Sequence, residues 1–240
     1  MNLSHRSNQT ERMDTDCVDF ADYSRCLRDL SRVNVVTLTH RPMLSWLAKR
    51  ARGDFSVLDI ACGHGDALRK IRARYPTARL TGIDLNPWAT RAAREATLSA
   101  AHIDFINGDA FAYKPEQKFD FIICSQFTHH LTDQQVVGFL RWLQDNAGIG
   151  WFISDLHRNL IPYYGFPILA RVAFWHRFVR EDGQISIARA FIRSEWDALL
   201  RQAGITEQEA FIAWYIPFRL CVGTCRLPTP WLPAPWSSAP

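Results

Sequence analysis

The chain has 240 residues, of which 48% are hydrophobic and 22% charged, and its formal net charge is +4. This composition suits one globular domain with an ordinary core. Lysine and arginine are spread along the chain without a basic block, so nothing indicates a nucleic-acid interface, and no apolar run approaches the ~20 residues that span a bilayer.

The two ends of the chain differ from the middle in composition. Residues 1–16 are polar and lack an apolar signal core, whereas residues 227–240 are rich in proline and tryptophan. We expect both segments to be disordered, and the polar start predicts a cytoplasmic location. The six cysteines show no zinc-finger spacing, so we expect them to be reduced thiols.

The middle of the chain alternates between patterns typical of helices and of buried strands. Apolar residues recur at helical spacing over 20–50, where Pro42 and the stretch VNVVTLT predict two helices rather than one. Strands are then expected at 55–61, 78–85, 102–108, 118–125 and 148–156, and helices at 66–75, from Pro87 and at 133–146. This alternation predicts an α/β fold with a doubly wound, mostly parallel sheet.

The last part of the chain predicts an insertion and a closing edge. Residues 157–193 are rich in aromatic and aliphatic side chains and are expected to form a helical substrate lid. A helix follows, with Ser194 as its N-cap and Gly204 as its end, and then one or two strands. We therefore expect a single domain at 17–226, with an N-terminal helical cap at 17–52.

The stretch VLDIACGHGD, residues 57–66, places a glycine turn directly after the first strand. A P-loop would need a lysine and a hydroxyl that are missing here, and a dinucleotide turn would need a small residue where Leu68 stands. Asp59 and Asp66 would also repel a pyrophosphate. The turn therefore favours a cationic ligand, and S-adenosylmethionine (SAM), with its sulfonium and ammonium groups, fits.

Four motifs in order carry a family resemblance. LDIACGHGD, GIDLNP, NGDAF and FDFIICSQFTHHL each follow or contain a predicted strand. Together they resemble the class I SAM-dependent methyltransferases over about residues 55–223. The resemblance implies a Rossmann-like seven-stranded sheet, with SAM as the cofactor at the carboxyl ends of the strands.

The resemblance also implies a role for individual residues. Asp59 would meet the SAM ammonium group, Asp84 would accept both ribose hydroxyls, and Asp109 would accept from the adenine amino group. Gly63 and Gly65 would let the backbone approach the methionine half of SAM. The expected cofactor-binding residues are Asp59, Ala61, Gly63, Gly65, Asp84, Leu85, Asp109, Ala110, Phe111, Gln126 and Phe127.

Histidines after the fourth and fifth strands are candidates for proton transfer. A phenol acceptor, with a pKa near 10, benefits from a base that works at neutral pH. We expect His130 or His157 to be this catalytic base and His129 to be structural, while Asp155 either orients a base or is a buried strand-end acid. A catechol-type metal site would need acids near the fourth strand's exit, so no metal is expected.

The expected function is O-methylation of a phenolic or otherwise apolar small molecule of quinone, polyketide or other secondary metabolism. C-methylation of a similar acceptor stays open, as do a nicotinamide-dependent oxidoreductase and a non-catalytic cofactor-binding protein. Methylation of nucleic-acid amines is disfavoured, because SQFTHH lacks the N/D-P-P-Y/F motif of those enzymes. The sequence leaves the oligomeric state open.

Overall fold

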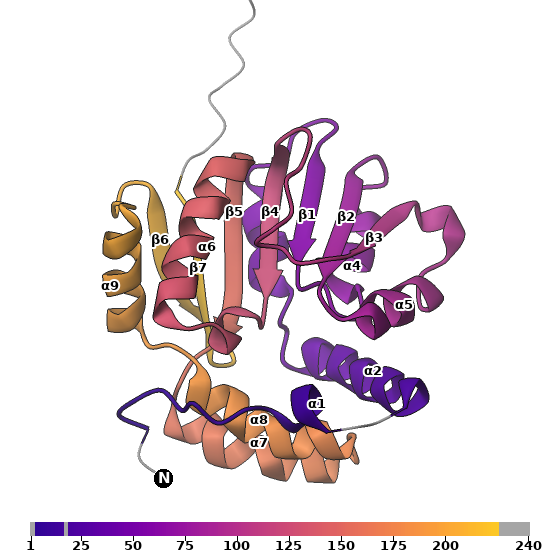
Figure 1. Cartoon of the computed structure of the whole chain (residues 1–240), viewed down its shortest axis with the longest axis vertical. Helices are drawn as coiled ribbons and strands as arrows, with labels where there is room; N and C mark the ends of the chain where they lie inside the picture. The colour runs from indigo at the N-terminus through magenta and orange to yellow at the C-terminus, as the bar shows by residue number, and fades with distance from the viewer. Residues whose placement is uncertain (1–2, 17–18, 226–240) are drawn as a thin grey trace, which may run out of the picture.

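The computed structural model of the chain describes residues 3–16 and 19–225, so the proline- and tryptophan-rich tail expected to be disordered lies outside it. One sheet has the strand order β3-β2-β1-β4-β5-β7-β6, in which β7 runs antiparallel to β5 and β6 (Figure 1). The strands are β1 (Ser56–Ile60), β2 (Arg79–Asp84), β3 (Ile103–Asn107), β4 (Phe119–Ser125), β5 (Ala147–Leu156), β6 (Ala210–Tyr215) and β7 (Arg219–Thr224). The predicted doubly wound, mostly parallel sheet is confirmed.

Helices cover both faces of this sheet and its carboxyl-terminal edge. They are α1 (Arg12–Thr15), α2 (Phe20–Val36), α3 (Arg41–Ala48), α4 (Asp66–Arg74), α5 (Pro87–Glu95), α6 (Asp133–Asn146), α7 (Leu160–Val172), α8 (Arg177–Arg189) and α9 (Arg193–Ala203), with short 3-10 turns η1 (Ser99–Ala101) and η2 (Thr128–His130). In the described residues, no helix combines the length and apolar character that crossing a membrane requires.

Two apolar cores, one on each face, hold the helices against the strands. On one face α6 and α9 pack on β1, β4, β5 and β7 around Trp151 and Trp196, which are fully buried. On the other face α3, α4 and α5 pack around Met43, Leu68 and Phe121. Burying a large side chain contributes about 1.5–3 kcal/mol, so the sheet provides a rigid base for the groups at its strand ends.

Local signals set most helix boundaries. Thr132 and Gln135 form a capping box that begins α6, and Gly204, with φ of 82°, ends α9. The prediction of Ser194 as an N-cap was wrong, because Ile192 is the extended residue before the helix. Glu195 fulfils the cap instead, since its carboxylate accepts from the Ile192 backbone N–H at 2.9 Å.

A layer of α1, α2, α7 and α8 lies below the carboxyl ends of the strands (Figure 1). Residues 3–16, which we expected to be disordered, run across α7 and α8 in this layer instead. The Ser7 N–H donates to the Ala188 carbonyl at 2.9 Å, and the backbone N–H groups of Arg12 and Met13 donate to Asp182. These tertiary bonds order a segment whose composition carries no helix signal.

Candidate functional site

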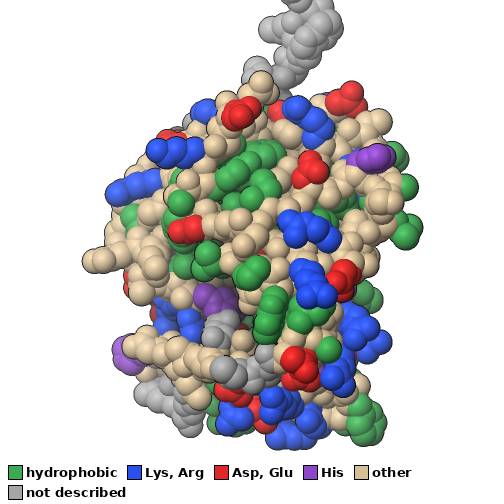
Figure 2. Space-filling model, turned by 45° about the vertical axis from the view of Figure 1, so that its right-hand side comes forward, with side chains coloured by type: hydrophobic (Ala, Val, Ile, Leu, Met, Phe, Trp, Pro, Cys, Tyr) green, Lys and Arg blue, Asp and Glu red, His purple; other side chains and the backbone are tan. Residues whose placement is uncertain are grey.

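Three cavities meet between the strand ends and this helical layer. We name them the large cavity, of about 860 Å³, the small cavity, of about 130 Å³, and the apolar cavity, of about 280 Å³. Gln126 and Leu30 line all three. Figure 2 shows a hollow, with histidine surface inside it, between the sheet body and the lower layer. Volume alone does not mark a site, since a hollow of about 890 Å³ lies at the opposite strand ends near Arg79 and Phe119.

Nearly all of the expected cofactor residues line the large or the small cavity. The large cavity is lined by Ala61, Asp84, Leu85, Asp109, Ala110, Phe111, Gln126 and Phe127, and the small cavity by Asp59, Ala61, Gly63 and Gln126. Gly65 lines none of the three. Its role in the structure is conformational: it has φ of 74° as the residue before α4, and a Cβ there would lie 2.7 Å from the Phe105 ring.

Asp84 fixes the geometry of the glycine turn. One carboxylate oxygen accepts from the Gly63 backbone N–H at 2.9 Å, and the other accepts from the Asn86 N–H at 2.9 Å. Burial raises the pKa of Asp84, and these two hydrogen bonds oppose that effect. Each oxygen keeps a second lone pair, so the carboxylate is held in place at the wall of the large cavity and can still accept from a ligand.

The acids around the small cavity differ in charge compensation. Asp66 lies 2.7 Å from His40 Nε2 and accepts from Asn34 at 3.1 Å. Burial alone would raise the pKa of Asp66, but these partners lower it to about 2. Asp59 is buried, and in the described residues its carboxylate has no hydrogen-bond partner. Burial, together with Asp66 and Asp84, raises its pKa well above the usual range. Asp59 is therefore the acid that a cationic ligand would stabilise.

An aromatic corner closes the far side of the large cavity. Phe111, Phe127 and Phe139 contact one another with ring centroids 5.5–6.5 Å apart. Asp109 is exposed, and its carboxylate accepts from the Phe111 backbone N–H at 2.8 Å, which sets the direction of the ring. A flat apolar ligand fits against such a corner.

The cavity junction contains strained backbone. Ala61 and Gln126 both have φ of 54°, a region that residues other than glycine rarely adopt. Gln126 is fixed on both sides, because its backbone N–H donates to the Ser154 carbonyl at 2.9 Å and its side chain donates to Asn34 at 2.7 Å. Strained residues of this kind cluster at active sites and at places where the backbone contacts a ligand.

The two histidines expected to be catalytic face different cavities. His130 lines the large cavity and is partly exposed, with Nε2 3.8 Å from Glu11 Oε1. His157 lines the apolar cavity, where its Nδ1 is buried without a hydrogen-bond partner. Burial and the charge of Arg158 lower the pKa of His157, so its imidazole is neutral at pH 7 and can accept a proton.

His129 is held between two acids. Its Nδ1 lies 2.7 Å from Asp155 Oδ1, and its Nε2 lies 3.4 Å from Glu11 Oε1. Burial by itself lowers the pKa of His129, but Asp155 and Glu11 raise it to about 9. Asp155 therefore orients His129, a choice that the sequence had left open. A protonated His129 cannot serve as a base at neutral pH.

Sequence reasoning missed the residues that the helical layer contributes. Leu30 and Asn34 come from α2, Glu11 and Met13 from the N-terminal segment, and Arg219 from the start of β7. No motif marks them, because they reach the site only through packing. The one available signal was the helical periodicity of 20–50, which predicted α2 without showing which of its faces meets the site.

Comparison with known proteins identifies the domain. Residues 57–146 match the model of a methyltransferase domain family. The trans-aconitate 2-methyltransferase of Streptomyces avermitilis is 36% identical over 89 residues, which cover 35% of this chain and 33% of that protein. The chain therefore contains a methyltransferase domain over these residues. A malonyl-[acyl-carrier protein] O-methyltransferase of Ilyobacter polytropus is 27% identical, and the match covers 35% of this chain and 31% of that protein.

Solved structures extend the likeness of this methyltransferase domain over most of the fold. The plantazolicin methyltransferase BpumL, in complex with SAH, has a TM-score of 0.61 and 16% identity, with 87% of this chain and 84% of that chain covered. Human N-acetylserotonin methyltransferase, in complex with SAM, has a TM-score of 0.61 and 17% identity, with 88% and 57% covered. At such identities the likeness shows the fold, and the chain spans about a third of the curated relatives that it matches.

Proposed function

We propose that the protein transfers a methyl group from SAM to an oxygen of a phenolic or otherwise apolar small molecule. The observation that carries this proposal is the arrangement of the three cavities, which meet at Gln126 and Leu30. A donor spread over the large and small cavities would have its methyl group near an acceptor in the apolar cavity. Holding two reactants in this way supplies much of what methyl transfer requires.

The residues around the large and small cavities, which we call the donor side, favour SAM over other cofactors. Asp84 would accept the ribose hydroxyls, the corner of Phe111 and Phe127 would pack on adenine, and Asp59 would pair with the ammonium group. Asp59 is buried without a protein partner, so its ionised carboxylate carries a desolvation cost. A cation bound in the small cavity would offset that cost. A pyrophosphate would increase that cost, which argues against a nicotinamide cofactor.

The apolar cavity indicates the kind of acceptor. It is lined by Met13, Val33, Phe166, Phe178, Val179 and Ile187 among others, and these side chains suit an aliphatic or aromatic body. Its ionisable lining residues are Glu11, His157, Asp182 and Arg219, and Arg219 is buried. The Arg219 side chain donates to Thr37 and Thr39 through Nη2, but Nε and Nη1 are buried without partners. An acidic group on the acceptor would satisfy these donors.

Together, Arg219 and His157 supply what O-methylation of a phenol requires. Arg219 would favour the phenolate, and His157 would accept the phenol proton. A lone pair of the acceptor oxygen then attacks the methyl carbon, and the carbon–sulfur bond breaks with its electron pair passing to sulfur. Both side chains line the apolar cavity, where the acceptor would lie.

A carboxylic acid is the second candidate acceptor. The relatives include proteins named trans-aconitate 2-methyltransferase and malonyl-[acyl-carrier protein] O-methyltransferase, and a carboxylate would pair with Arg219 as well as a phenolate would. A carboxylate is already ionised at neutral pH, so this reaction would not need His157 as a base. Replacement of His157 therefore distinguishes the two acceptors.

Donor identity is tested first by thermal unfolding with SAM, SAH, NAD and NADP in turn. A ligand at about 100 times its dissociation constant adds about 2.7 kcal/mol of stability. We expect protection by SAM and SAH only. Protection by a nicotinamide cofactor alone would overturn the proposed function.

Acceptor class is tested by calorimetry of the SAH-saturated protein with matched probes. We expect 4-pentylphenol to bind more tightly than its methyl ether, and octanoate more tightly than octanol. Arg219→Gln should remove about tenfold of that preference, whereas Arg180→Gln, at an exposed position of α8, should keep it. Equal binding of the acidic and neutral probes to the wild-type protein would contradict an acidic acceptor.

A further inference from the structure

Glu11, His129 and His130 form a cluster on the wall of the large cavity, which we name the His–Glu cluster. Their potential ligand atoms all lie within 4.8 Å of one another. Glu11 Oε1 is 3.4 Å from Nε2 of His129 and 3.8 Å from Nε2 of His130. Glu11 and His129 are buried, so the cluster is part of the interior.

The spacing within the cluster differs from that of a direct charge-assisted hydrogen bond. Such bonds between nitrogen and oxygen are about 2.7–2.9 Å long, and His129 reaches 2.7 Å with Asp155 on its other side. Glu11 stands further from both histidines. Ligand atoms at about 2.0–2.1 Å from a tetrahedral zinc ion lie about 3.3–3.4 Å apart, which is close to the two Glu11 distances.

The surroundings of His129 match those of a metal ligand. Histidines that bind metals usually donate their second ring nitrogen to a carboxylate, which fixes the ring and its tautomer. Asp155 Oδ1 occupies that position at Nδ1, while Asp155 Oδ2 accepts from the His129 backbone N–H at 3.0 Å and from the Thr128 hydroxyl. Asp155 is itself buried, so it holds the imidazole with Nε2 toward Glu11.

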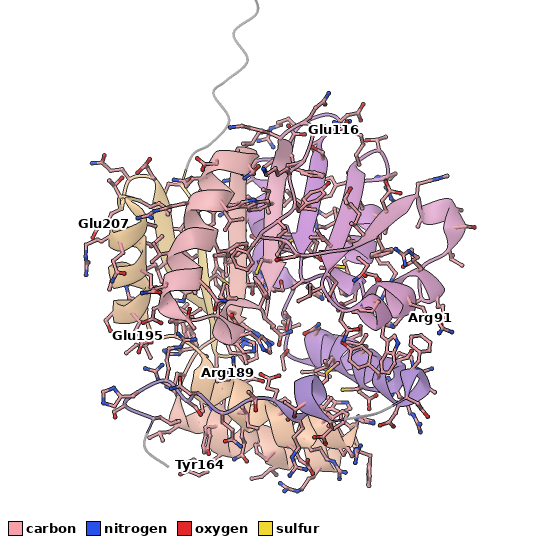
Figure 3. All side chains as sticks on the ribbon, viewed as in Figure 1. Arg91, Glu116, Tyr164, Arg189, Glu195 and Glu207 are labelled. Atoms are coloured by element: carbon pink, nitrogen blue, oxygen red, sulfur yellow. The ribbon has the colours of Figure 1, made fainter. Side chains whose placement is uncertain are left out.

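Two arginines fix the backbone of the same turn. Arg189, at the edge of α8 that faces the strand ends (Figure 3), donates to the carbonyls of His129 and His130 at 3.1 and 3.0 Å. Arg6 donates to the Leu131 carbonyl at 2.9 Å and to Asp133 at 2.6 Å. The turn that presents both histidines is therefore rigid before any ligand binds, as a metal site requires.

We propose that the His–Glu cluster binds a divalent transition-metal ion, Zn²⁺ in the first instance, through Glu11 and Nε2 of His129 and His130, with the Nε2 proton of His129 released to solvent as the ion binds. Two imidazoles and one carboxylate suit zinc, and they leave a fourth position open toward the large cavity. From the sequence no metal was expected, and Glu11 was not among the candidate residues because its segment has no motif. His130 is then a ligand rather than a general base.

The ion's contribution to catalysis rests on the proposed function, whereas its binding does not. Glu11 lines both the large and the apolar cavity, so the open position lies near the place where donor and acceptor would meet. A divalent ion there would lower the pKa of an acceptor hydroxyl, so that its proton leaves to His157 or water at neutral pH.

The test is direct metal binding by the full chain after removal of metal with EDTA. Titration with Co²⁺, a spectroscopic probe for zinc sites, should give visible d–d absorption at one equivalent, and Zn²⁺ should displace it. His130→Ala and Glu11→Gln should each weaken binding about 100-fold, and Asp155→Asn about tenfold. His102→Ala, at an exposed histidine outside the cluster, should change nothing.

Absence of the Co²⁺ absorption in the wild-type protein would overturn the metal site, and so would unchanged binding in His130→Ala. His130 is partly exposed, so this variant keeps the test decisive if Glu11→Gln does not fold. SAM binding measured in the wild-type protein separates the two proposals. SAM affinity without Co²⁺ binding would contradict the metal site alone, whereas Co²⁺ binding without SAM affinity would contradict the proposed function alone.

Discussion

Residues around the large and small cavities come mainly from one run of the chain, from Asp59 to Gln135, in which a glycine, acid or amide lies at or just after the end of each strand. Residues around the apolar cavity come instead from six segments: the N-terminus, α2, the β4 exit, the β5 exit, α7–α8 and the start of β7. The donor side is thus assembled by the sheet itself, whereas the acceptor side depends on the packing of distant helices. Changes at the strand ends should therefore affect SAM affinity, and changes in the helical layer at residues outside the large and small cavities should leave it intact.

The largest expected effect is at the glycine turn. Gly65→Ala should lower the free energy of unfolding by about 3 kcal/mol, because it combines an unfavourable φ with a 2.7 Å contact to Phe105. Gly53→Ala is the control, since Gly53 has φ of 57° but open space around it, and should cost about 1 kcal/mol. Urea unfolding measures both. Equal costs would mean that the contact with Phe105 is unimportant.

Next in size is the loss of the Asp84 carboxylate. Asp84→Ala should weaken SAM binding about 100-fold, equivalent to about 2.8 kcal/mol, because it removes the ribose acceptor and releases the Gly63 and Asn86 N–H groups. Asp104→Ala, an exposed acid on β3, should leave the affinity unchanged. Calorimetry with SAM checks both, and comparable affinities would show that the donor side does not depend on the second strand's acid.

An acid-dependent effect follows from Asp66. Since its pKa is lowered to about 2 in the folded protein, below the usual 3.8, the ionised Asp66 carboxylate, held by His40 and Asn34, stabilises the fold above about pH 4. This stability, about 2 kcal/mol, should be lost as the pH falls from 4 toward 2. Urea unfolding of the wild type and Asp66→Asn at pH 6, 4 and 3 measures the difference. A difference that does not shrink on acidification would exclude ionisation of Asp66 as its source.

The smallest effect is expected in the N-terminal segment. Arg6→Ala should lower stability by about 1 kcal/mol, since the guanidinium contacts the Leu131 carbonyl, Asp133 and the Phe191 ring. SAM affinity should stay within about twofold. Arg12→Ala removes an exposed ion pair with Glu181 and should change neither quantity. A large loss of SAM affinity in Arg6→Ala would show that the two sides are coupled.

Much of the donor side could be predicted because strand-end motifs are local. The order of strand, glycine turn and helix places Asp59 and Asp84 at one edge of any parallel sheet, and the structure has both at cavity walls. That SAM occupies these cavities stays a prediction, as do the catalytic role of His157 and the division into cap and lid. The helix start near Ser194 was misplaced, because a serine two residues into a helix has the same composition signal as a cap.

The residues of the acceptor side, around the apolar cavity, could not be predicted from local motifs. Glu11 reaches His129 only because the N-terminal segment bonds to Asp182 and Ala188 on α8, more than 150 positions later in the chain. Likewise, the unpartnered nitrogens of Arg219 have meaning only once the apolar cavity around them is known. Polar residues that are far apart in the sequence form no periodic pattern, so a single sequence does not indicate that they are in contact.

The sequence by itself determined the sheet, its strand ends and the class of donor, because short apolar runs, glycine turns and acids act within a few neighbouring residues. Only the tertiary structure decided which histidine is buried between acids, which acid lacks a partner, and which arginine keeps free donors. Those properties are set by burial, by the distances between charges, and by the helices that happen to cover them.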